Sequence, residues 1–120
     1  MPSSPQLSDE EIYQQVANIV GQFKLLECDE CAQAIKEWLK ANRINGIHLK
    51  ISPLDQADFI LSERWDGGRT TICQNGLHYG IEVRGKVFDN LSPIGISRED
   101  WIADFYCGIG EFIIQELEKF

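Results

Sequence analysis

The chain has 120 residues and a formal net charge of −8 at pH 7. This length fits one domain with one modest core. The acidic balance argues against duplex nucleic acid and against an anionic membrane as partners, since both need clustered Lys and Arg. No apolar run approaches the roughly 18 residues that would span a bilayer.

The N-terminus predicts neither a secretory signal nor ordered structure. Residues 1–7 hold two prolines and two serines, without a basic or an apolar region. We therefore expect a disordered lead over 1–7, a single domain over 8–120, and a chain that is cytoplasmic as synthesised. The four cysteines are then expected to be free thiols.

Two amphipathic helices are predicted at the start of the domain. Ser8 and Glu11 form a capping box, and apolar residues at helical spacing indicate a helix over about 9–22. A second helix is expected over about 28–42. Its apolar stripe consists of Cys31, Ala32, Ile35, Trp38 and Leu39.

The pattern then becomes alternating, which is typical of half-buried strands. Strands are expected at 47–52, 77–83 and 86–90. In the first of these, His48 is expected to point into solvent. Two further short strands are expected, at 59–61 and 70–73, the second because it is rich in β-branched residues.

The last part of the chain gives a mixed pattern. Ser97 has the spacing of a helix cap, whereas the tail from Gly110 to Phe120 combines strand-like and helix-like features. Helices first, then strands, then a helix predict an α+β domain, with helices packed on an antiparallel sheet.

The two-residue turn Arg84-Gly85 sets the register of the central hairpin. Ile81 then faces Phe88 on the core side, while His78 and Asp89 are diagonal neighbours on the other face. Asn90 points to the core side in this register. A slip of one residue would place Asn90 instead of Asp89 on the face of His78. Asn90 is therefore the alternative candidate for the residue that orients the imidazole.

A thiol, a histidine and an acid in this order indicate a cysteine hydrolase. Cys28 begins the second helix, where unpaired N–H groups and the helix dipole favour a thiolate. Cys31 is the alternative nucleophile, but its place on the apolar stripe favours a packing role. Gln22 is a weak candidate for binding the oxyanion, and the backbone N–H of the nucleophile is a safer donor.

Three segments together resemble the papain-fold toxin domain, second subfamily, of bacterial polymorphic toxin systems. They are Cys-Asp-Glu-Cys-Ala at 28–32, the run from Gly76 to Asn90, and Gly95-Ile96 followed after four residues by Trp101. The run around His78 is the most specific part, and the resemblance covers about 23–106.

This resemblance implies a compact papain-like fold and a triad of Cys28, His78 and Asp89. It also implies amide-directed chemistry, such as peptide hydrolysis or deamidation, by an effector delivered to a target cell. Its partners would be a protein or peptide substrate and an immunity protein. We expect no cofactor, no metal ion, no nucleic acid and no membrane.

Two other classes of function remain open at this stage. One is a non-catalytic binding module that keeps a hydrolase fold. The other is a zinc or redox module based on the Cys28-x-x-Cys31 spacing, although Cys73 and His78 supply a second ligand pair poorly. Cys73 and Cys107 are otherwise expected to be buried packing thiols.

Overall fold

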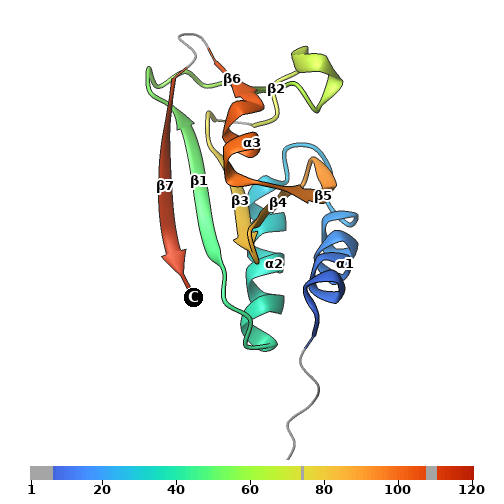
Figure 1. The fold of residues 1–120 in the computed structure, drawn as a ribbon. Coiled ribbons are helices and arrows are strands. Elements are labelled where there is room, and N and C mark those ends of the chain that lie inside the picture. The colour runs from blue at the N-terminus through green and yellow to red at the C-terminus, as the bar shows by residue number, and fades with distance from the viewer. Residues whose placement is uncertain (1–6, 74, 108–110) are drawn as a thin grey trace, which may run out of the picture.

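The structure is a computed structural model that describes residues 7–73, 75–107 and 111–120. Its centre is an antiparallel sheet of five strands in the order β5-β4-β3-β1-β7 (Figure 1). The strands are β1 (Ile47–Pro53), β3 (His78–Val83), β4 (Lys86–Asp89), β5 (Ser92–Ile96) and β7 (Phe112–Lys119). The fold is therefore α+β, as predicted.

Two helices, α1 (Asp9–Val20) and α2 (Cys28–Ala41), pack on one face of the sheet. The capping box at Ser8 and Glu11 is present at the start of α1. The predicted contact between the second helix and the hairpin is confirmed, with Trp38 at the edge of the shared core. The buried residues of this core are Ile12, Val16, Val20, Cys31, Ala32, Ile35, Leu39, Ile44, Ile81, Val83 and Phe88.

The opposite face of the sheet is also covered. The third helix, α3 (Arg98–Ala103), lies there with a two-stranded sheet of β2 (Leu61–Ser62) and β6 (Phe105–Tyr106), and a short 3-10 helix, η1 (Asp66–Gly68), follows β2. The sheet therefore separates two cores, whereas the sequence predicted one. The second core contains Leu49, Ile51, Ile60, Ile72, Cys73, Val87, Trp101 and Phe105.

The β3–β4 hairpin has the predicted register. Ile81 pairs with Phe88 across the two strands, and both turn residues, Arg84 and Gly85, have positive φ angles of 49° and 82°. Such angles suit the tight turn that matches the twist of a two-stranded ribbon. The face that carries His78 and Asp89 is thereby fixed, and it is the face that α3 and β6 cover.

One local prediction was wrong and another was incomplete. Residues 70–73 form no strand. The backbone N–H groups of Ile60 and Cys73 donate to the Thr71 hydroxyl, so they are not available for hydrogen bonds between strands. The tail is resolved as strand β7, which pairs along the whole of β1. Of the expected lead over 1–7, only Leu7 lies within the described residues, and it packs against the first core.

His48 was predicted to be solvated, and this was also wrong. The side chain is 3% exposed, beneath α2, with its Nδ1 3.3 Å from the Nζ of Lys36. Strand alternation does place it opposite Leu49, but both faces of the sheet are covered. His48, although polar and on the face opposite Leu49, is therefore buried between the sheet and α2.

Candidate active site

Cys28 is the first residue of α2, and its side chain lies at the end of the sheet where β3 begins. Its residue exposure is 6%, and its Sγ is 3.8 Å from the carbonyl oxygen of Leu77. Glu27, the residue before the helix, makes no side-chain cap hydrogen bond. The free N–H groups of the first turn and the helix dipole therefore act on this end of the site.

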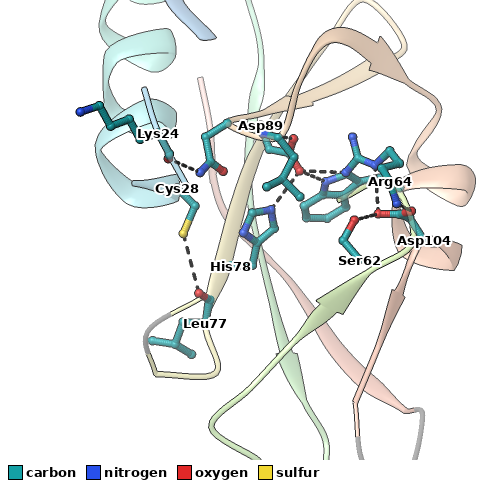
Figure 2. Close-up of polar contacts among 11 residues, drawn as sticks. Lys24, Cys28, Ser62, Arg64, Leu77, His78, Asp89 and Asp104 are labelled. Atoms are coloured by element: carbon teal, nitrogen blue, oxygen red, sulfur yellow. Dashed lines mark hydrogen bonds and ion pairs between the residues drawn. The ribbon is translucent and has the colours of Figure 1, made fainter. Parts of the chain in front are cut away.

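His78 is the first residue of β3 and is fully buried. Its Nε2 is 2.9 Å from the Oδ2 of Asp89, so the predicted hydrogen bond between the two is present (Figure 2). The imidazole is stacked on Trp101 and meets the edge of Phe105, with ring centroids 6.0 and 5.1 Å away. Aromatic rings on two sides leave the imidazole little freedom to rotate.

The other ring nitrogen of His78, Nδ1, is buried and has no hydrogen-bond partner among the described residues. Burial by itself would lower the pKa of His78. Interactions with Asp89 and with Cys28 outweigh burial and raise this pKa to about 9. The thiol of Cys28 is thus close enough to His78 to influence its protonation, while Asp89 is hydrogen-bonded to Nε2 of the ring.

Asp89 is buried but fully provided with hydrogen-bond donors. Its Oδ2 accepts hydrogen bonds from Nε2 of His78 at 2.9 Å, Nε1 of Trp101 at 2.9 Å and Nη2 of Arg64 at 3.0 Å. Its Oδ1 accepts the backbone N–H of Leu91 at 3.1 Å. Burial would raise the pKa of Asp89, but His78, Arg64 and Trp101 together hold it well below its usual range.

The two candidate nucleophiles have different environments. Cys31 has no exposed surface, and burial together with the nearby charge of Asp89 raises the pKa of its thiol to about 12. Such a thiol stays protonated at neutral pH and packs in the first core. The structure therefore favours Cys28 over Cys31 as the sulfur that can exchange a proton with His78.

The two weaker candidates lie elsewhere. The Gln22 side chain is exposed and donates to the carbonyl oxygen of Asn18 at 3.5 Å, and no described contact joins it to Cys28. The Nδ2 of Asn90 donates to the carbonyl oxygen of Lys24 at 2.8 Å. Asn90 therefore ties β4 to the segment before α2, and Asp89 is the residue on the imidazole.

Sequence reasoning missed the role of three polar side chains around Asp89. Arg64 and Asp104 extend the site, and the indole N–H of Trp101 donates a hydrogen bond to Asp89. Arg64 falls in a segment without a periodic pattern, 25 residues before Asp89 in the chain. A single half-buried arginine in such a segment gives no local signal.

Within the described ranges, no three His, Cys, Asp or Glu side chains gather as a metal site, and Cys28 and Cys31 are free thiols. Nor does any helix in these ranges have the length and apolar character to cross a membrane.

Comparison with known proteins gives a family for the chain. No curated protein and no solved structure matches it significantly. The family model of papain fold toxin 2 matches residues 11–106, which include Cys28, His78 and Asp89 and extend from α1 to β6. The chain therefore belongs to the papain fold toxin 2 family.

Proposed function

We propose that this protein is a cysteine hydrolase that acts on amide bonds, with Cys28, His78 and Asp89 as its catalytic residues. The observation that carries the proposal is the state of the imidazole. One nitrogen, Nε2, is fixed by Asp89. The other, Nδ1, is buried beside the thiol at the start of α2 and has no hydrogen-bond partner in the part of the chain that the structure describes. The reaction would be peptide cleavage, deamidation or a related amide-directed transfer.

The first step transfers the proton of the Cys28 thiol to Nδ1 of His78, which gives a thiolate and an imidazolium. The thiolate attacks the carbonyl carbon, and a carbon–sulfur bond forms. Negative charge then develops on the carbonyl oxygen, and the free N–H groups of the first turn of α2 are placed to stabilise it.

The second step breaks the carbon–nitrogen bond. His78 returns its Nδ1 proton to the leaving amine, and an acyl-enzyme remains on Cys28. Water, or an amine in a transfer reaction, then attacks the thioester, and His78 takes a proton from this nucleophile. Throughout the cycle Asp89 accepts a hydrogen bond from the Nε2–H group of His78, which keeps Nδ1 directed to the sulfur.

The setting of this activity follows from the family. As a member of the papain fold toxin 2 family, the protein would act on a protein or peptide substrate in a target cell, and an immunity protein would protect the producing cell. For this chain, the substrate, the immunity partner and the delivery are proposals that rest on that membership. The buried, charge-paired histidine supports catalysis over a binding role, because a binding module has no need of such a group.

The test is selective alkylation of thiols by iodoacetamide at pH 6, where an ordinary thiol is almost wholly protonated. We expect Cys28 to be modified first, at a site located by peptide mass analysis, and Cys28→Ala to remove the fast reaction. The same variant should abolish toxicity when the protein is expressed in a bacterial host. Cys31→Ala is the matched control and should keep both properties.

Two results would reject the proposal. One is slow modification of all four cysteines at pH 6. The other is full toxicity of Cys28→Ala, which would leave the binding module as the better explanation.

A further inference from the structure

The carboxylate of Asp89 is held by a cation from a part of the chain remote from the hairpin. Arg64 lies between β2 and η1, and its Nη2 is 3.0 Å from the Oδ2 of Asp89. Its Nε is 2.9 Å from the Oδ2 of Asp104, and its backbone N–H donates to the Oδ1 of Asp104 at 2.9 Å. Figure 2 shows the guanidinium between the two carboxylates. One arginine thus bridges two buried acids.

Asp104 is itself fixed in place. It directly follows α3, its side chain is 7% exposed, and the hydroxyl of Ser62 on β2 donates to its Oδ2. The order of charges through this part of the second core is therefore His78, Asp89, Arg64 and Asp104, with alternating sign. The last member of the series, Asp104, has the uncharged Ser62 hydroxyl as its further hydrogen-bond donor.

We propose that Arg64, anchored by Asp104, is a positioning residue that keeps Asp89 ionised and aligned both when His78 is protonated and when it is neutral. The inference rests on the proposed function. In that cycle His78 takes up and gives back a proton, so it cannot be a permanent counter-charge for Asp89. Arg64 can, because a guanidinium keeps its charge at any pH at which a protein is folded.

The need for such a residue follows from burial. Burying a carboxylate away from water and without a counter-charge raises the free energy of the folded protein. Protonation of the carboxylate, or its rotation toward another donor, lowers that free energy again. Either change would free Nε2 of His78 whenever the imidazole became neutral. The two edges of the guanidinium suit this task, since each one reaches a different carboxylate in a fixed geometry.

The charges around His78 define the signs that a test should find. The groups that face the ring or its carboxylate are Cys28 from α2, Asp89 from β4 and Arg64 after β2. Asp104 after α3 pairs with Arg64, and Cys31 lies near Asp89. Loss of the positive charge of Arg64 leaves Asp89 to stabilise the imidazolium more strongly, so His78 should hold its proton to higher pH. Loss of the negative charge of Asp104 should have the opposite effect.

The experiment is a pH titration of the imidazole C–H signals by NMR. The chain has two histidines, so His78 and His48 can be followed together, and His48 on the opposite face serves as an internal reference. We expect Arg64→Gln to raise the His78 midpoint by about one pH unit and Asp104→Asn to lower it. Arg64→Lys, which keeps the charge, should stay close to the unmodified protein.

A matched control is available in Arg98. This arginine also bridges two acids, Glu82 at 2.6 Å and Glu116 at 2.9 Å, but it does not contact Asp89. Arg98→Gln should leave the His78 midpoint unchanged. If Arg64→Gln does not fold, Arg64→Lys and Asp104→Asn still carry the test, because an electrostatic role predicts an unchanged His78 midpoint in Arg64→Lys and a lowered midpoint in Asp104→Asn.

The outcomes separate this inference from the function on which it rests. An unchanged His78 midpoint in Arg64→Gln, or changes of the same sign in Arg64→Gln and Asp104→Asn, overturns the positioning role. Failure of the proposed function would appear without any change at Arg64 or Asp104. Cys28 of the unmodified protein would be alkylated slowly, and the His78 midpoint would not respond to Cys28→Ala. Opposite changes in the two charge variants support the inference.

Discussion

The two faces of the sheet each bury one histidine, and the two imidazoles are in opposite electrostatic environments. His48 lies under α2 with its Nδ1 3.3 Å from the ammonium of Lys36, and burial and Lys36 lower its pKa. His78 lies under α3 with a carboxylate at 2.9 Å, and its pKa is raised to about 9. Burial disfavours the imidazolium at both sites, so the charge of the neighbour determines which histidine can hold a proton.

This difference is the reason why we propose different roles for the two faces. The His48 face holds the large apolar core that α1 and α2 form with the sheet, and a neutral imidazole is compatible with it. The His78 face carries the charge series that ends at Asp104. A basic imidazole beside a thiol can accept a proton, and for this reason we place the proposed catalysis on the second face.

The largest expected effect separates the two histidines directly. His78→Gln should reduce activity and the pH 6 alkylation of Cys28 by at least about a thousandfold, because it removes the base that we propose for the Cys28 thiol. His48→Gln should leave both unchanged within a factor of about two to three. Rates of alkylation and toxicity on expression measure the difference. Equal losses in the two variants would contradict the assignment of function to one face.

The next largest effect tests the two charged neighbours that distinguish the histidines, which are Asp89 at His78 and Lys36 at His48. Asp89→Asn should lower the His78 pKa and reduce activity by about 100- to 10,000-fold, since the amide can neither balance the imidazolium nor fix its tautomer. Lys36→Gln should raise the His48 pKa, because the nearby positive charge is removed. NMR titration of the two variants should show these opposite shifts; a His78 midpoint unaffected by Asp89→Asn would be inconsistent with the hydrogen bond.

The pH dependence of stability should show the same contrast with opposite slopes. The folded-state pKa of His78 lies above 6.5, so its stabilising contribution is complete below about pH 6.5 and is lost as the pH rises to about 9. This interval corresponds to about 3 kcal/mol of unfolding free energy at most. His48, with a lowered pKa, stabilises above pH 6.5 and loses this contribution as the pH falls.

Urea unfolding of the unmodified protein from pH 5 to pH 9 measures both slopes. His78→Gln should flatten the alkaline side of the stability profile and His48→Gln the acidic side. A steeper alkaline loss in His78→Gln would mean that another group is responsible.

The smallest effect concerns the second cysteine. Cys31→Ala should lower the free energy of unfolding by about 1 kcal/mol through a small cavity in the first core, with activity retained. Cys28→Ala should abolish activity at little cost in stability, because its side chain lies outside both apolar clusters. Denaturant unfolding and alkylation kinetics of the two variants check this. Loss of activity in Cys31→Ala alone would make Cys31 the nucleophile.

The sequence by itself determined the local elements that carry Cys28, His78 and Asp89, which are helix α2 and the hairpin of β3 and β4. The Ser8 capping box, the apolar stripe of α2 and the Arg84-Gly85 turn depend on residues close together in the chain, and all three are present in the structure. The turn set the register of β3 and β4, and this register placed Asp89 rather than Asn90 on the face of His78.

Only the tertiary structure decided what covers that face. Strand alternation distinguishes two faces but does not reveal which one meets solvent, and here α2 and α3 bury both, so His48 was misplaced. Arg64 reaches Asp89 only because β2 pairs with β6, a contact between residues more than 40 positions apart. Such pairing depends on how the whole chain closes around the sheet, and no local pattern of residues encodes it.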